Sequence, residues 1–141
     1  MQHAATELFE LLKTRLPGIL MKEASNTESV YLYLADGYWM AFERSAYRLC
    51  TLFPEAIQLP MKVATVPFPI VAAGVPCSSA SAVLGRLTCV AHSSVERIYK
   101  VAQPWGEVAY CRWHKRMTCG VARPRRSAAA GVGEKTKITK I

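Results

Sequence analysis

The sequence predicts one α/β or α+β domain of ordinary size, followed by a basic C-terminal tail. The chain has 141 residues, of which 51% are hydrophobic, so it carries enough apolar material to bury a core. Segments with the spacing of an amphipathic helix alternate with short runs that are typical of strands. This pattern ends near Cys119, and we therefore expect a domain over residues 1–119 and a flexible tail over residues 120–141.

The first third of the chain is expected to contain a helix and a pair of strands. Leucines at helical spacing predict a helix over residues 4–14, and the Pro-Gly pair at 17–18 is expected to end it. The apolar run at 19–21 and the β-rich run at 30–34 are then expected to pair as a hairpin. The Asp-Gly pair at 36–37 is typical of a turn.

A second helix is expected after the apolar segment at 38–42. It continues to Phe53, and Pro54 stops it. Its buried face is expected to consist of Ala46, Leu49, Cys50 and Phe53. Its exposed face is expected to consist of Glu43, Arg44 and Arg48.

The rest of the chain continues the alternation of strands and helices. Apolar runs predict strands, a serine before an apolar stripe predicts the start of a helix, and Gly-Pro segments predict turns. The expected order is a short strand within 57–66, a strand at 68–73, a turn at 74–76, a helix from about Ser78 to Ala91, a strand at 95–101, a turn at 103–106 and a strand at 108–113.

The net charge of +8 is concentrated at the C-terminal end of the chain. Residues 111–141 carry nine Lys and Arg against the single acidic residue Glu134, whereas residues 1–110 are balanced. A neutral body with a cationic end predicts a polyanionic partner, either nucleic acid or an anionic membrane surface. The alternative is that the tail only aids solubility.

The cysteines and the N-terminus predict a cytoplasmic protein. Five cysteines are an odd number, and the first residues lack the charged and apolar regions of a signal peptide, so a disulfide framework is not expected. The longest uncharged stretch lies between Lys62 and Arg86 and contains three prolines. It is therefore not expected to span a membrane.

A zinc site is one alternative for the cysteines. Cys89 with His92 and Cys111 with His114 share a Cys-x-x-His spacing, with Cys119 nearby, and four such side chains can hold zinc. We instead expect free cysteines, with Cys89 on a helix face and Cys111 in a core strand, and no metal or other cofactor.

No enzymatic signature is found. The Gly-rich segment at 131–136 differs from a phosphate-binding loop because Glu134 precedes the lysine. No local pattern pairs a nucleophile with a base, and the acidic residues are dispersed. We therefore expect a binding protein rather than an enzyme.

Three segments share motifs with one known family. The first is residues 36–42, Asp-Gly-Tyr-Trp-Met-Ala-Phe, with an alanine four residues after the Phe. The second is residues 73–76, Ala-Gly-Val-Pro, followed by two leucines at matching offsets, and the third is residues 106–111, Gly-Glu-Val-Ala-Tyr-Cys. In this order, over roughly residues 4–113, they resemble the N-terminal mismatch-recognition domain of MutS DNA mismatch repair proteins.

The resemblance implies a mixed β-sheet flanked by helices and a DNA-binding module without the ATPase. In that family an aromatic residue inserts beside a mispaired base and a Glu two residues later bonds to that base, which implies such roles for Tyr38 and Met40. Met40 cannot accept a hydrogen bond as a carboxylate does. Trp39, between them, is a further candidate for stacking on bases.

The sequence therefore predicts a nucleic-acid-binding module with a preference for distorted or mispaired DNA. Tyr38, Trp39 and Met40 would supply the contacts of the domain. The alternative is that Tyr38, Trp39 and Phe42 pack under the sheet. The tail residues expected to contact phosphates are Arg123, Arg125, Arg126, Lys135, Lys137 and Lys140. The alternative is a protein-interaction module that keeps the fold and has lost DNA recognition.

Overall fold

The computed structural model describes residues 6–101 and 106–121. The helices of these ranges are α1 (Thr6–Thr14), α2 (Leu16–Ala24), α3 (Glu43–Leu52), α4 (Cys77–Leu84) and α5 (Glu107–Thr118). The strands are β1 (Ser29–Ala35), β2 (Tyr38–Phe42), β3 (Ile57–Met61), β4 (Ile70–Pro76), β5 (Thr88–His92) and β6 (Glu96–Lys100). The tail beyond residue 121, with its six candidate phosphate contacts, and most of the predicted turn at 103–106 lie outside the described residues.

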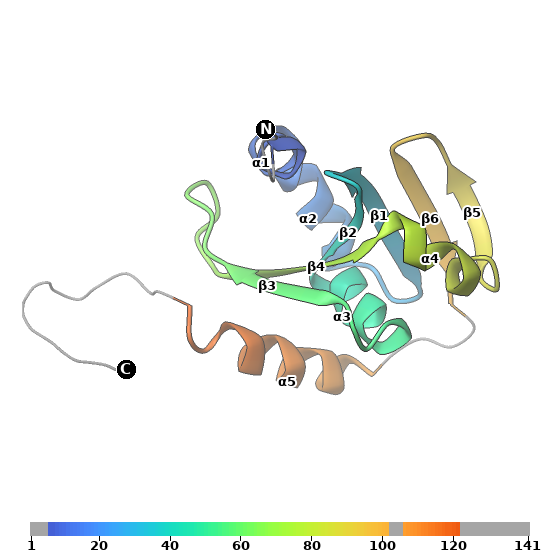
Figure 1. Ribbon diagram of the computed structural model, residues 1–141. Coiled ribbons are helices and arrows are strands. Elements are labelled where there is room, and N and C mark those ends of the chain that lie inside the picture. Colours follow the sequence, from blue (N-terminus) through green and yellow to red (C-terminus); the bar gives the residue numbers. More distant parts are fainter. Residues whose placement is uncertain (1–5, 102–105, 122–141) are drawn as a thin grey trace, which may run out of the picture.

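The six strands form one antiparallel sheet in the order β3-β4-β2-β1-β6-β5 (Figure 1). This confirms an α+β fold. The mixed sheet expected from the resemblance is wrong, because every pair of neighbouring strands is antiparallel.

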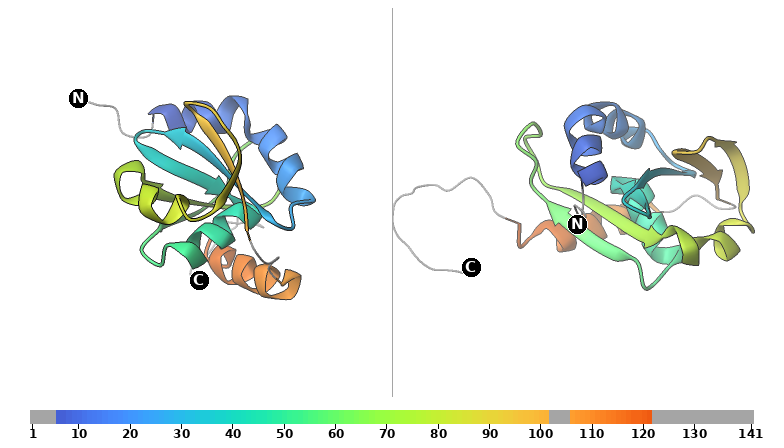
Figure 2. Two further views of the ribbon diagram at one scale, coloured as in Figure 1. Left: turned by 90° about the vertical axis from the view of Figure 1, so that its right-hand side faces the viewer. Right: turned by 45° about the horizontal axis from the view of Figure 1, so that its top comes forward.

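Helices cover both faces of the sheet, as the views in Figure 2 show. Side chains alternate between the two faces along each strand, so β2 sends Trp39 and Ala41 to one core and Met40 and Phe42 to the other. The first core is closed by α3, α4 and α5, and the second by α1 and α2. The protein is therefore a three-layer sandwich with two apolar cores.

The central hairpin of β1 and β2 turns at the predicted Asp-Gly pair. Asp36 has φ of 55° and Gly37 has φ of 81°, the left-handed conformation that a two-residue hairpin turn requires. The predicted strand at 30–34 is confirmed.

The N-terminal segment forms a second helix instead of the expected strand at 19–21. Pro17 lies in the first turn of α2, where a missing N–H costs nothing, so it does not end the helical region. Leu16, Ile19 and Glu23 recur at helical spacing and are buried.

The predicted turn at 74–76 is wrong, because these residues complete β4. Gly74 lies opposite Met40 of β2, and a Cβ on Gly74 would lie only 2.7 Å from the Met40 sulfur. The glycine therefore serves the close approach of a side chain rather than a turn. The helix expected to reach Ala91 ends at Leu84 instead, since residues 88–92 form β5.

The strand predicted at 108–113 is also wrong, because this segment is the helix α5. Tyr110 and Trp113 are buried and Met117 is half-buried, which is the spacing of one helix face. Glu107 in the first turn and Lys115 and Arg116 in the last turn suit the helix dipole. The third segment of the MutS resemblance thus opens a helix.

Neither disulfides nor a membrane span is found among the described residues. All five cysteines are free. Within residues 6–101 and 106–121, each helix is too short or too polar to cross a lipid bilayer.

Candidate functional site

The three candidate DNA contacts of the domain have different exposures. Trp39 is 5% exposed and Met40 is 4% exposed, each in one of the two cores, so neither offers its side chain to a ligand on the surface. The alternative interpretation, packing under the sheet, therefore holds for Trp39 and for Phe42, which is fully buried. Tyr38 is half-buried and packs beside the core under α1 and α2.

The turn next to Tyr38 caps α1. The Asp36 carboxylate accepts hydrogen bonds from the backbone N–H groups of Glu7 and Leu8, at 3.1 and 2.9 Å. In return, the Asp36 N–H donates to Glu7 Oε1 at 2.7 Å. This is the reciprocal logic of a capping box, made by residues far apart in sequence. The Asp-Gly pair therefore has a structural role beyond the turn.

The cysteines and histidines considered for zinc lie on two separate elements. Cys89 and His92 are exposed on β5, and Cys111 is exposed on α5, so the predictions of a helix face for Cys89 and a core strand for Cys111 are wrong. Among the described residues, no group of three or more His, Cys, Asp or Glu side chains is arranged to hold a metal ion.

A contact between Glu43 and His114 that the sequence does not predict joins α3 to α5. Glu43, expected on the exposed face of its helix, is 9% exposed. Its Oε1 accepts a hydrogen bond from the Val71 N–H at 2.9 Å and lies 2.8 Å from Nε2 of His114. The φ of Glu43 is 53°, an unfavourable conformation for a residue with a side chain, so these contacts hold the backbone under strain.

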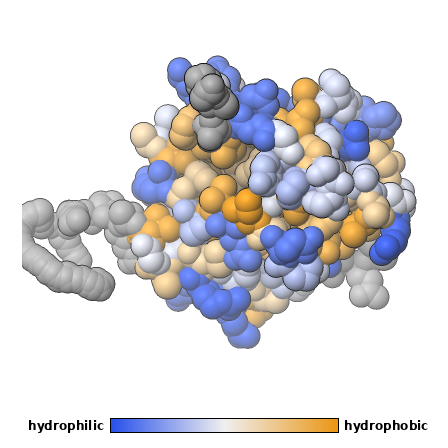
Figure 3. Space-filling view, viewed as in Figure 1, coloured by the Kyte–Doolittle hydropathy of each residue, from blue (hydrophilic) through white to orange (hydrophobic). Residues whose placement is uncertain are grey.

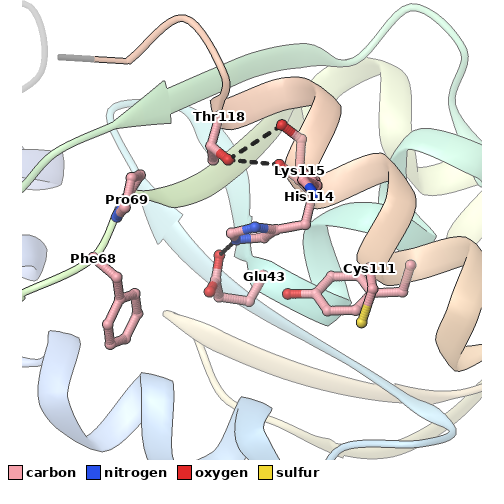
Figure 4. A pocket seen from close by; sticks show the side chains of 8 residues that line it. Glu43, Phe68, Pro69, Cys111, His114, Lys115 and Thr118 are labelled. Atoms are coloured by element: carbon pink, nitrogen blue, oxygen red, sulfur yellow. Dashed lines mark hydrogen bonds and ion pairs between the residues drawn. The ribbon is translucent and has the colours of Figure 1, made fainter. Parts of the chain in front are cut away.

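The side chains of Glu43 and His114 line a pocket of about 340 Å³ (Figure 4). Phe68 and Pro69, just before β4, form one side. The opposite side is α5, which contributes Tyr110, Cys111, His114, Lys115 and Thr118. The pocket thus combines aromatic and apolar walls with an imidazole, a carboxylate and an ammonium group.

Cys111 and His114 do not form a nucleophile and base pair. Figure 4 shows the Cys111 sulfur pointing away from the His114 ring. The thiol instead lies 3.7 Å from Glu107 Oε2, to which it donates. Nucleophilic catalysis needs the base within hydrogen-bond reach of the nucleophile, and His114 is not so placed for Cys111.

The N-terminal end of α5 is fixed to α3. Arg44 forms an ion pair with Glu107, and its guanidinium lies 4.8 Å from the centre of the Tyr110 ring. The hydrogen bond from Arg44 lowers the pKa of the Glu107 carboxyl. Farther along the same helix, three cationic side chains are exposed to solvent: Arg112, Lys115 and Arg116.

A second buried carboxylate, Glu23 of α2, is structural. It is 1% exposed and accepts hydrogen bonds from the Ser45 N–H at 2.9 Å, from the Ser45 hydroxyl at 2.5 Å and from Asn26 at 3.3 Å. Burial raises the pKa of Glu23 to about 7, against the lowering effect of these bonds. Because the group is covered on all sides, it joins α2 to α3 rather than meeting a ligand.

The candidate residues thus form two regions. The first contains Tyr38 and the capped turn beside α1, and the second contains the pocket and the cationic surface of α5. They belong to opposite faces of the sheet. A scan of protein-family models and searches of curated proteins and of solved structures found no match to this chain.

Proposed function

We propose that this protein is a nucleic-acid-binding module that holds phosphates on α5 and on the basic tail that follows it. The observation that carries the proposal is the exposure of Arg112, Lys115 and Arg116 on α5. Among the described residues, none of the three is in an ion pair, so their charges are not neutralised by a neighbour. The same charge sign continues in the tail, from Arg123 onward.

Cations in this arrangement suit a phosphate backbone. Each Lys or Arg that contacts a phosphate releases a condensed counterion, which gives affinity without sequence preference and a strong dependence on salt. The helix supplies contacts at fixed spacing, and the lysines and arginines of the tail add further positive charges. A cytoplasmic location, as the sequence predicts, is part of the same proposal.

The preference for distorted or mispaired DNA, which the MutS resemblance implies, stays part of the proposal. Of its three candidate residues Tyr38 is half-buried, whereas Trp39 and Met40 are buried. Trp39 and Met40 would support it from the two cores. Tyr38 and α5 belong to opposite faces of the sheet, so its contribution must be tested separately.

The test is a fluorescence-anisotropy titration with single-stranded, matched and single-mismatch DNA at two salt concentrations. Reversing two charges on α5, Arg112→Glu with Arg116→Glu, is expected to weaken binding to all three DNAs by roughly tenfold. The slope of the logarithm of the binding constant against the logarithm of the salt concentration is expected to fall in magnitude by about 2. The matched control reverses two exposed charges elsewhere, Lys13→Glu with Arg86→Glu, and is expected to change little. Absence of salt-dependent binding to any of the three at low ionic strength would overturn the proposal.

The same titration tests the preference for mismatched DNA by comparing the matched and the mismatched duplex. Tighter binding to the mismatched duplex that Tyr38→Ala removes would support the family function. Equal binding to all three DNAs that disappears on truncation after Gly120 would limit the function to contacts of the tail.

A protein-interaction module is the second candidate, and β5 favours it. All five residues of this edge strand are exposed, and Val90 is 58% exposed. Exposed edge strands can pair with a strand of another chain. On the face seen in Figure 3, hydrophobic residues lie in groups among hydrophilic ones. A protein complex lost in Val90→Lys and kept in the α5 charge-reversal variant would favour this candidate.

A further inference from the structure

We propose that the pocket beside α5 binds an unpaired nucleobase, with Phe68 as the stacking surface and Lys115 as the neighbouring phosphate contact. This inference rests on the proposed nucleic-acid function. It adds the position of a base-binding site and the state of the base that the site accepts.

The first argument is the exposure of Phe68. Its side chain is 46% exposed, whereas Val66 two residues earlier is 5% exposed and Ile70 two residues later is fully buried. The ring is therefore not needed to fill the core, and it forms one wall of the pocket. An exposed aromatic ring beside a cavity is what a base needs for stacking, since every base has a π face.

The second argument is the combination of groups across from Phe68. The Glu43 and His114 side chains both line the pocket and offer hydrogen-bonding groups to the edge of a base. Tyr110 adds a second aromatic ring to the walls. Their positions are fixed by the 2.8 Å contact between Glu43 and His114, so a ligand would find them already placed.

The third argument is charge at the rim. A base that enters the pocket leaves its phosphates outside, and the cationic side chain of α5 that lines the pocket and is exposed to solvent is that of Lys115. Arg112 and Arg116 lie on the same helix and continue the cationic surface away from the pocket. The volume of about 340 Å³ lies in the range of small-ligand sites.

The site selects for unpaired bases on physical grounds. In a matched duplex both faces of a base are covered by its neighbours and its edge is paired, so entry into a pocket costs unstacking and unpairing. That cost is smallest for a single strand or a mispaired step. The pocket belongs to the α5 face, so this base site is separate from Tyr38.

The test compares two single-stranded DNAs of equal length, an oligothymidylate and an abasic strand that has the phosphates without the bases. The full chain is expected to bind the oligothymidylate about tenfold more tightly. Phe68→Ala is expected to remove this difference while leaving affinity for the abasic strand unchanged, and Phe68→Trp is expected to keep it. The matched control is Phe9→Ala, which removes a 66% exposed phenylalanine on α1. Thermal unfolding of each variant checks that the fold is kept.

The outcomes separate this inference from the proposed function. Equal affinity for the two strands, or a preference that survives Phe68→Ala, would overturn the base site while salt-dependent binding kept the proposed function. No binding to either strand would overturn the base site, and the proposed function falls with it only if duplex DNA is not bound either. A preference that Phe9→Ala removes as well would also count against a role specific to Phe68.

Discussion

Glu43 is the residue at which backbone strain, burial and charge meet. Its carboxylate satisfies the Val71 N–H and contacts the His114 ring, while its φ of 53° is unfavourable for any residue with a Cβ. A buried polar group that loses its partner costs more than the bond itself contributes. The strained conformation is therefore stable only because the side chain makes these contacts.

Substitutions of Glu43 separate the two effects. Glu43→Ala removes both contacts and keeps the strain, so we expect the free energy of unfolding to fall by about 2 kcal/mol. Glu43→Gln keeps an acceptor for the Val71 N–H and is expected to lose less. Glu43→Gly loses the same contacts as alanine but tolerates positive φ, so it should be more stable than Glu43→Ala by about 1 kcal/mol.

Urea unfolding measures these differences, with the exposed Glu55→Ala as the control, for which a change within about 0.5 kcal/mol is expected. Equal stability of the alanine and glycine variants would show that the strain is not stored at this residue. Equal stability of the alanine variant and the wild type would show that the pair with His114 does not hold α5.

The helix α5 is attached to α3 through aromatic side chains. The ring centres of Tyr47 and Trp113 lie 5.3 Å apart, and those of Tyr47 and Tyr110 lie 5.9 Å apart. These contacts join α5 to α3, and with them one wall of the pocket. The position of the whole helix, and hence of its cations, depends on this cluster.

Trp113→Ala is expected to loosen α5 before the sheet. Truncating a buried Trp costs roughly 3 kcal/mol, and α5 is the last element of the described fold. Hydrogen exchange should therefore become faster in α5 while the amides of β1 and β2 stay protected. Val108→Ala, on the exposed side of the same helix, is the control and should leave exchange unchanged. An equal acceleration in α5 and in the sheet would mean that α5 opens only by global unfolding.

The same elements show how far local sequence patterns reach. The strand at 30–34 and the turn at 36–37 are predictable because their residue preferences are local, whereas the predicted pairing of that strand with residues 19–21 is wrong, since β1 pairs with β2. The helix α2 was missed because Pro17 is compatible with a first turn as well as with a helix end. The helix α5 was misassigned because Val, Tyr and Trp favour strands, and the period of its buried residues decided the outcome.

The candidate site could not be predicted from local sequence patterns. Glu43 and His114 are 71 residues apart, and neither lies in a motif that points to the other. Phe68 lies among prolines, in a segment that the sequence analysis assigned to a strand. Only the packing of α5 against α3 and β4 brings the three residues to one pocket. The charge distribution indicates that cations gather after residue 110. Their exposure on one helix could not be predicted, because residues 108–113 were assigned to a strand.

At the scale of the whole molecule, one buried carboxylate connects the two sides of the fold. Glu23 on α2 is bonded to Ser45 on α3, and the Ser45 hydroxyl also accepts a hydrogen bond from the Tyr31 N–H of β1 at 2.9 Å. A helix from each face of the sheet and a central strand therefore share one polar network. A change in its charge is expected to act on global stability rather than on a single element.

The pH dependence of unfolding follows from this network. The pKa of Glu23 is about 7 in the folded protein, because burial and the charge of Glu43 raise it above the ordinary value of 4.5. Between these values the folded state holds a proton that the unfolded chain has released, so the free energy of unfolding falls as the pH rises from about 4.5 to 7. The loss from this group amounts to roughly 3 kcal/mol and is complete above that window.

Glu23→Gln removes the titration and keeps a neutral polar group in the network. Urea unfolding between pH 4.5 and 8 should show a smaller decline in stability for this variant than for the wild type. The two proteins should be similar at the acidic end, and the variant should be the more stable at pH 8, because it has no charge to bury. A wild-type stability that rises over this range, in parallel with the variant, would mean that Glu23 is already ionised at the acidic end. In that case the hydrogen bonds from Ser45 and Asn26 would outweigh the desolvation of the carboxylate.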